Sequence, residues 1–166
     1  DQGKRWLAYA ADGTDVWPLT ECHKARDSVP SIHMPRWASR ITLILIDVQR
    51  GFDDPSWGKR NNPGAEANIA RLLDAWTGPL VLVRHDSTNP DSPLRPGQDG
   101  NRFKPELDRA VPDLVFGKSV NSSFHGEVDL HAWLTARGIT DIVLAGIQTN
   151  MCVETTARLG GNLGYR

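Results

Sequence analysis

The chain has 166 residues, of which 39% are hydrophobic and 23% are charged, and its formal net charge is -1 at pH 7. This length suits one domain with a sizeable core. The near-neutral charge, with both signs interspersed, argues against nucleic acid or an anionic membrane surface as a partner. The longest apolar run, Ile41–Ile46, is too short to span a bilayer, and the polar N-terminus lacks the pattern of a signal peptide. We therefore predict a cytoplasmic protein, for which small neutral partners are at least as plausible as charged ones.

The first 40 residues show no convincing period. Their tryptophans are scattered among Pro, Gly and charged residues. We assign residues 1–40 as an N-terminal segment of uncertain order, followed by one domain at residues 41–166. Cys22 and Cys152 are the only cysteines, and with no secretion signal we predict that both are free thiols.

Four short apolar runs follow in the domain, each rich in Val, Ile and Leu without clean alternation. Such runs are typical of strands covered on both faces. They lie at residues 42–46, 80–83, 114–116 and 142–145.

Helical patterns separate these runs. Between the first two runs, Asn62 is a predicted cap with Pro63 at the first helical position, and apolar residues recur at helical spacing as far as Trp76. Leu130 and its neighbours predict a second helix that ends at Gly138. The order of elements predicts an α/β fold, a three-layer sandwich with a mostly parallel, Rossmann-like sheet.

Two regions depart from this rhythm. Residues 86–112 are rich in Pro, Gly, Asn and Asp, and they predict a long loop of the kind that often carries function. Residues 160–166 are predicted to form a helix exit and a turn, after which no further strand follows. We expect a sheet truncated at its C-terminal edge, with the last strands and helix missing.

Three reactive side chains follow strands of this predicted sheet. Asp47 comes directly after the first strand, Lys118 ends the third, and Cys152 follows the fourth. Ligands of open α/β sheets bind at the carboxyl ends of the strands, so we expect these side chains to meet at one edge. Thr149 or Asn150 would cap a helix that begins just before Cys152, and a thiol in the first turn of a helix has a lowered pKa. Asp47 would accept its proton, and Lys118 would stabilise the negative charge.

Each of these residues also has a structural interpretation. Cys152 would then pack a helix onto the sheet as a small apolar residue, Asp47 would cap a turn, and Lys118 would be a solvated residue at a strand end. The joint occurrence of a base, a cation and a nucleophile on three different strands favours the chemical interpretation.

Three stretches of the sequence resemble the signatures of the isochorismatase-like cysteine hydrolases. They are residues 45–49 with Phe52, residues 117–118 with 121–124, and residues 146–153. The resemblance extends over residues 41–166 and includes residues 83–85 and 92–97.

By this resemblance, Asp47, Lys118 and Cys152 match the catalytic triad of the family. The resemblance also implies a cis peptide bond between Ile147 and Gln148. The backbone N–H groups of Gln148 and Cys152 would then hold an oxyanion.

The activity implied by the resemblance is cleavage of a C–N bond in a small amide, carbamoyl or ureido compound through a thioester. Isochorismatases proper share the fold, the Asp and the Lys, but they hydrolyse a vinyl ether without a cysteine nucleophile. Cys152 therefore favours the cysteine amidohydrolase branch, while an isochorismatase-type ether hydrolase and a truncated, non-catalytic remnant stay open as alternatives. Many family members are homo-oligomers, so we expect a homo-oligomer if the sheet is completed.

Nicotinamidases of this family bind a divalent ion through an Asp-x-His pair and a further His. Here residues 84–90 contain only His85, and the next histidine is His125. We predict no metal and no cofactor, which makes nicotinamide a disfavoured substrate. His85 is then structural or a pocket wall, and His125 and His131 are predicted on or near a helix surface.

Three apolar residues adjoin the signature residues and are candidates for substrate contact, namely Phe52, Phe124 and Ile147. Ordinary packing is the alternative for each of them.

Overall fold

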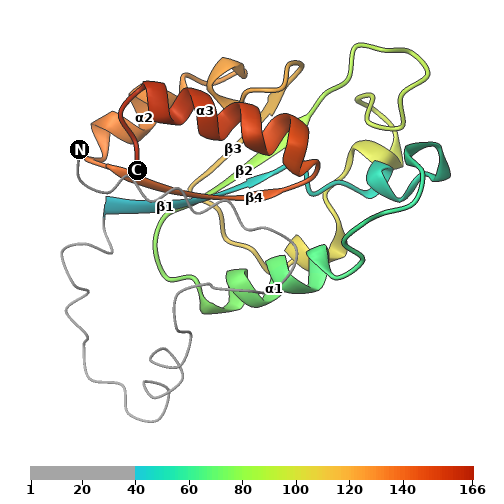
Figure 1. The fold of residues 1–166 in the computed structure, drawn as a ribbon, viewed down its shortest axis with the longest axis horizontal. Coiled ribbons are helices and arrows are strands. Elements are labelled where there is room, and N and C mark those ends of the chain that lie inside the picture. The colour runs from blue at the N-terminus through green and yellow to red at the C-terminus, as the bar shows by residue number, and fades with distance from the viewer. Residues whose placement is uncertain (1–39) are drawn as a thin grey trace, which may run out of the picture.

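The computed structural model describes residues 40–166, which form a four-stranded sheet with helices on both faces (Figure 1). The strands are β1 (Ile41–Ile46), β2 (Leu80–His85), β3 (Leu114–Lys118) and β4 (Asp141–Gly146). All pairings are parallel, and the strand order is β3-β2-β1-β4. The predicted α/β class is thereby confirmed. The predictions for residues 1–39, including the free thiol of Cys22, lie outside the described residues.

Helices cover the sheet on both sides. Helix α1 (Ala65–Ala75) lies on one face, while α2 (Leu130–Ala136) and α3 (Glu154–Asn162) lie on the other (Figure 1). Because the strands are buried on both faces, successive residues feed two separate clusters. Leu43 and Leu45 of β1 pack in the hydrophobic cluster on the side of α1. Ile44 and Ile46 pack in the cluster on the side of α2 and α3. This arrangement explains why the strands read as continuous apolar runs rather than alternating ones.

The register of the sheet brings the carboxyl ends of the strands together. Ile46, the last residue of β1, pairs with Val83 of β2 on one side and with Gly146 of β4 on the other. Val83 in turn pairs with Phe116 of β3, and His85 pairs with Lys118. The residues that follow β1, end β3 and follow β4 are therefore delivered to one edge.

Helix starts differ in detail from the predictions. Helix α1 begins at Ala65 rather than Pro63, with Gly64 at its N-cap and no side-chain cap, because Asn62 closes the turn with its backbone oxygen instead. Helix α2 is capped by Asp129, whose side chain accepts a hydrogen bond from the Ala132 backbone at 2.9 Å. Gly138 follows α2 with a φ of 66°, in agreement with the predicted stop.

The segment between β2 and β3 is irregular, as predicted, apart from two short 3-10 helices at Asp99–Asn101 and Pro105–Leu107. Its backbone is nevertheless anchored, since Asn101, Lys104 and Leu107 are buried. The loop is therefore a packed part of the domain.

Strand β4 lies at one border of the sheet. The Ile142 N–H donates to the Arg166 carbonyl at 2.8 Å, and the Arg166 N–H donates to the Thr140 carbonyl at 3.0 Å. These two bonds flank Asp141 in the manner of a parallel ladder, so Arg166 lies alongside β4. None of the helices in residues 40–166 has the length and apolar character needed to cross a membrane.

Candidate active site

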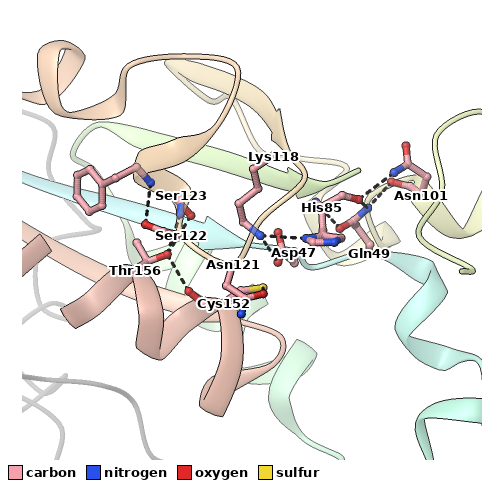
Figure 2. A network of polar contacts seen from close by, with 11 residues as sticks. Asp47, Gln49, His85, Asn101, Lys118, Asn121, Ser122, Ser123, Cys152 and Thr156 are labelled. Carbon is pink, nitrogen blue, oxygen red and sulfur yellow. Dashed lines mark hydrogen bonds and ion pairs between the residues drawn. The ribbon is translucent and has the colours of Figure 1, made fainter. Parts of the chain in front are cut away.

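A buried ion pair forms the centre of the site (Figure 2). Lys118 Nζ lies 2.7 Å from Asp47 Oδ2, and both side chains are fully buried. Asp47 leaves β1 with a φ of 56°, in the left-handed region that Asp adopts more readily than most residues. Its backbone N–H still donates to the Val83 carbonyl at 2.8 Å, so the turn begins directly at the end of the sheet.

The two oxygens of the Asp47 carboxylate are not equivalent. Oδ2 accepts from Lys118, whereas Oδ1 is buried and accepts no hydrogen bond from residues 40–166. Burial raises the pKa of Asp47, and the charge and hydrogen bond of Lys118 offset this only in part. A carboxylate with a free lone pair and a raised pKa is suited to accept a proton.

Cys152 lies next to this pair. Its Sγ, a carboxylate oxygen of Asp47 and a ring nitrogen of His85 all lie within 4.8 Å of one another. The thiol also faces Asn121, with Sγ 3.9 Å from Oδ1. The Cys152 carbonyl accepts from Thr156 Oγ1 at 2.7 Å, which ties the backbone of the thiol to helix α3. The structure thus brings the three predicted residues Asp47, Lys118 and Cys152 together.

The local structure around Cys152 differs from the prediction. Cys152 lies in a π-helical turn, Thr149–Val153, that precedes α3, and Gln148 at its N-cap makes no side-chain capping bond. Burial, followed by the negative charge of Asp47, raises the pKa of the Cys152 thiol to about 12. The prediction that the helix start lowers this pKa was wrong, because desolvation and the charge of the neighbouring carboxylate both favour the neutral thiol. With this pKa the group at neutral pH is a thiol.

The segment between β4 and Cys152 contains a cis peptide bond between Ile147 and Gln148. The Ile147 N–H donates to the Ile46 carbonyl at 3.0 Å, so this segment stays attached to the end of β1. Gln148 follows directly, and its carbonyl accepts from Met151 and Val153 within the π-helical turn.

The two predicted aromatic contacts lie in different surroundings. Phe52 packs with Leu94 and Ile147 in a small apolar cluster of its own, and its ring centroid lies 5.1 Å from that of Trp57. Phe124 belongs to the core under α2 and α3 and stacks on Tyr165 at 5.8 Å. The packing interpretation therefore suits Phe124, while Phe52 and Ile147 share the cluster that adjoins the cis peptide.

Four further polar residues lie at the site, namely Gln49, His85, Asn101 and Asn121, and only His85 was considered from the sequence, as a structural residue or a pocket wall. Its Nδ1 lies 3.3 Å from Lys118 Nζ, and its backbone contacts Gln49 and Asn101 (Figure 2). Asn121 contacts the Cys152 thiol. Gln49 and Asn121 stand inside the signature stretches, but nothing in a single sequence tells which of their atoms reach which partner.

Asp47, His85 and Cys152 are the only described group of three or more acidic, His or Cys side chains whose donor atoms converge closely enough to hold a metal ion. The Lys118 ammonium already lies among these donors, 2.7 Å from Asp47 and 3.3 Å from His85. A divalent cation would have to compete with that charge at close range. The metal-independent mechanism stays a prediction.

The family of the chain follows from its sequence as well as its fold. Residues 42–166 match the family model described as the isochorismatase domain. The chain belongs to the isochorismatase family. It is 39% identical over 126 residues to the isochorismatase-family protein YrdC of Bacillus subtilis, and the alignment covers 74% of this chain and 67% of that protein.

A solved structure and a named enzyme extend the comparison within the isochorismatase family. The crystal structure of a family member from Chromobacterium violaceum matches with a TM-score of 0.71 at 46% identity, over 76% of this chain and 67% of that one. Ureidoacrylate amidohydrolase RutB of Methylobacterium radiotolerans is 45% identical over 123 residues, which cover 69% of this chain and 38% of RutB. The chain therefore spans about two thirds of the first two relatives and less of the third. Named relatives in the family are hydrolases, and some of them are amidohydrolases.

Proposed function

We propose that the chain carries the active site of a metal-independent cysteine amidohydrolase, which cleaves the C–N bond of a small amide, carbamoyl or ureido compound. The observation that carries this proposal is the Asp47 carboxylate, which is buried, bonded to Lys118 through one oxygen, and unpartnered within residues 40–166 at the other, beside the Cys152 thiol. A thiol with a pKa of about 12 needs a base at the moment of attack, and burial, which raises the pKa of the Asp47 carboxylate, makes it a stronger base than an exposed one.

The first half of the reaction forms a thioester. Asp47 takes the Sγ proton as the sulfur bonds to the substrate carbonyl carbon, and the backbone N–H groups of Gln148 and Cys152 hold the oxyanion. The C–N bond then breaks, the leaving nitrogen takes the proton from Asp47, and ammonia or an amine departs.

The second half returns the enzyme to its resting state. Asp47 takes a proton from water, whose oxygen attacks the thioester carbon. The C–S bond breaks, the sulfur recovers the proton from Asp47, and the acid is released. Throughout, the Lys118 ammonium offsets the negative charge that moves between carboxylate, sulfur and oxyanion.

The decisive experiment pairs a substrate screen with variants of the nucleophile. The full chain is offered small amides, carbamoyl compounds and ureido acids, and ammonia release is measured. Cys152→Ala and Cys152→Ser are each expected to lower kcat by roughly 10⁴-fold or more, as removal of a covalent nucleophile does. Mass spectrometry of the quenched wild-type reaction should find an acyl adduct on the peptide that contains Cys152.

His131→Asn provides a matched control, because His131 contacts Tyr165 in the packing of α2 and no group of the triad. It should turn over at the wild-type rate. Full activity in Cys152→Ala would overturn the proposal, and hydrolysis of isochorismate with no activity on the amide panel would favour the ether-hydrolase alternative.

A further inference from the structure

The His85 imidazole lies inside the triad, yet the proposed reaction gives it no proton to carry. Its Nδ1 is 3.3 Å from Lys118 Nζ, and the same ammonium is 2.7 Å from Asp47. A lysine ammonium has three N–H donors and no acceptor. The contact therefore requires a lone pair on Nδ1, which assigns the neutral ring with its proton on Nε2. Burial first, and then the charge of Lys118, lower the pKa of His85, in keeping with this neutral form.

Side chains hold the backbone of His85, the last residue of β2. Strand β1 ends its pairing with β2 at Ile46 and Val83, two residues before His85. Beyond that point the Gln49 side chain replaces the missing strand. Its Oε1 accepts from the His85 N–H at 2.8 Å, and its Nε2 donates to the His85 carbonyl at 3.0 Å. A primary amide presents the same donor and acceptor as a peptide group, so it can continue the ladder.

A second amide reinforces the first. Asn101 Nδ2 donates to the His85 carbonyl at 3.0 Å and to the Leu94 carbonyl at 2.8 Å, and Gln49 Nε2 donates to the Asn101 carbonyl at 2.8 Å. Gln49 is fully buried and Asn101 is 8% exposed. The amides of Gln49 and Asn101 thus fix the backbone of His85. Among the described residues, the ring nitrogen Nδ1 of His85 contacts Lys118 (Figure 2).

We infer that His85 is a positioning residue, whose neutral imidazole accepts a hydrogen bond from Lys118 and so fixes the ammonium between Asp47 and Cys152. A lysine head group is a point charge on a flexible four-carbon stem. With one N–H bonded to Asp47 and a second bonded to His85, the third stays available to the reacting sulfur and oxygen. The inference rests on the proposed function for its chemistry, but its first consequence concerns the thiol alone.

The test measures the alkylation rate of Cys152 by iodoacetamide, followed by peptide mass spectrometry so that Cys22 is counted separately. His85→Leu removes the acceptor and should slow alkylation of Cys152 roughly tenfold, the effect of one hydrogen bond to a charged group. On a substrate found in the screen, kcat should fall by a similar factor with KM within about threefold of wild type. His85→Asn keeps an acceptor oxygen near the Nδ1 position and should restore most of both rates.

His125→Leu is the matched control, since it makes the same change at an exposed histidine and should leave both rates unchanged. If His85→Leu lacks a cooperative melt, His85→Ala with and without free imidazole takes its place, and imidazole should restore the rate. Wild-type rates in a folded His85→Leu or His85→Ala variant would overturn the inference, as would a folded His85→Asn variant as slow as His85→Leu. A wild type that is silent on every amide but alkylates in a His85-dependent way would overturn the proposed function only.

Discussion

At the level of single residues, the site depends on a charged pair that is stable only as a pair. Lys118 and Asp47 are fully buried, and each neutralises the charge of the other at 2.7 Å. Their burial is costly, and removing one partner leaves the other as an uncompensated charge inside the protein. The pair therefore has a structural consequence that can be measured without any substrate.

We predict that Lys118→Met lowers the free energy of unfolding by about 3–5 kcal/mol, because Asp47 is left buried without its counter-charge. The double variant Asp47→Asn with Lys118→Met should be clearly more stable than Lys118→Met alone, since it carries no buried charge at this position. Urea unfolding at pH 7 measures both. If the loss of unfolding free energy in the double variant equals the sum of the losses in Lys118→Met and Asp47→Asn, the two residues act independently.

The pH dependence of the site follows from the same residues. Because burial raises the pKa of Asp47, the carboxylate form is lost on acidification at a higher pH than for an ordinary Asp of pKa about 3.9. The value of kcat/KM should fall as pH falls through that raised pKa. Because the pKa of Cys152 is about 12, alkylation without substrate should keep rising through the alkaline range. A plateau near neutral pH would instead indicate a preformed thiolate.

At the level of elements, the approach of β4 to β1 depends on one glycine. Gly146 has a φ of 153°, and a Cβ added there would lie 1.9 Å from the Ile46 carbonyl oxygen. The last residue of β4 must therefore lack a side chain if the two strands are to stay paired up to the point where Asp47 and Ile147 leave the sheet.

We predict that Gly146→Ala destabilises the fold by about 3 kcal/mol or more, since overpacking against backbone cannot be relieved by rotating a side chain. Gly138→Ala is the matched control. It also has a positive φ, of 66°, but nothing lies within 4 Å of its added Cβ, so only the conformational cost of about 1–2 kcal/mol remains. Thermal and urea unfolding of the two variants compare them directly, and equal losses would contradict the clash.

A second group of charges ties α1 to the loops around the site. Glu66, in the first turn of α1, accepts from Arg60 at 2.5 Å and from Lys104 at 2.7 Å, and Lys104 also pairs with Asp53. Lys104 is 3% exposed and also donates its backbone N–H to the Val48 carbonyl. The cluster therefore connects the long loop and α1 to the segment that follows Asp47.

We predict that Glu66→Gln costs about 2–3 kcal/mol of stability at pH 7, because Lys104 and Arg60 then keep only Asp53 as a carboxylate partner. Burial raises the pKa of Glu66, but the hydrogen bonds from Arg60 and Lys104 outweigh it and leave this pKa lowered. A lowered pKa stabilises the fold above the unfolded-state pKa of about 4.3, and that stabilisation is lost as pH falls through the folded-state pKa. The difference between wild type and variant should shrink below pH 4 in chemical unfolding curves, and a constant difference would contradict it.

At the level of the whole molecule, the sheet joins two cores into one cooperative unit. Leu43 lies in the α1-side cluster and Leu134 in the cluster under α2 and α3, and both are fully buried. Leu43→Ala and Leu134→Ala should each cost about 2–5 kcal/mol. Because the residues lie on opposite faces, the double variant should equal their sum within about 0.5 kcal/mol, and fluorescence and far-UV circular dichroism should report one coincident transition. Val111→Ala, at a residue that is 88% exposed, serves as the control and should change little.

The fold could be predicted well from the sequence, because parallel strands covered on both faces are recognised as short, continuous apolar runs. A short apolar run such as the one ending at Ile46 is best explained as a buried strand. Because parallel strands place their carboxyl ends at one edge of the sheet, Asp47, Lys118 and Cys152 are then expected to lie together. No long-range information is needed for that step.

Other features depended on contacts between distant segments, which a single sequence does not reveal. The pKa of Cys152 is raised because Asp47 comes from another strand and the site is buried, whereas the local helix signal alone suggested a lowered pKa. Phe124 looked like a pocket residue by its position at the end of a signature stretch, but its ring stacks on Tyr165, 41 positions later in the sequence, as part of the core. The backbone of His85 is held by hydrogen bonds to Gln49 and Asn101, which lie far from it along the chain.

The amide of Gln49 has one more consequence, which concerns ageing of the protein. Hydrolysis of this side chain to Glu, the change made by Gln49→Glu, would swap one nitrogen for an oxygen and leave the shape of the residue almost unaltered. The group that now donates to the carbonyls of His85 and Asn101 would become an acceptor facing two acceptors. A change of one atom, without effect on size, would thus turn attraction into repulsion at the end of β2.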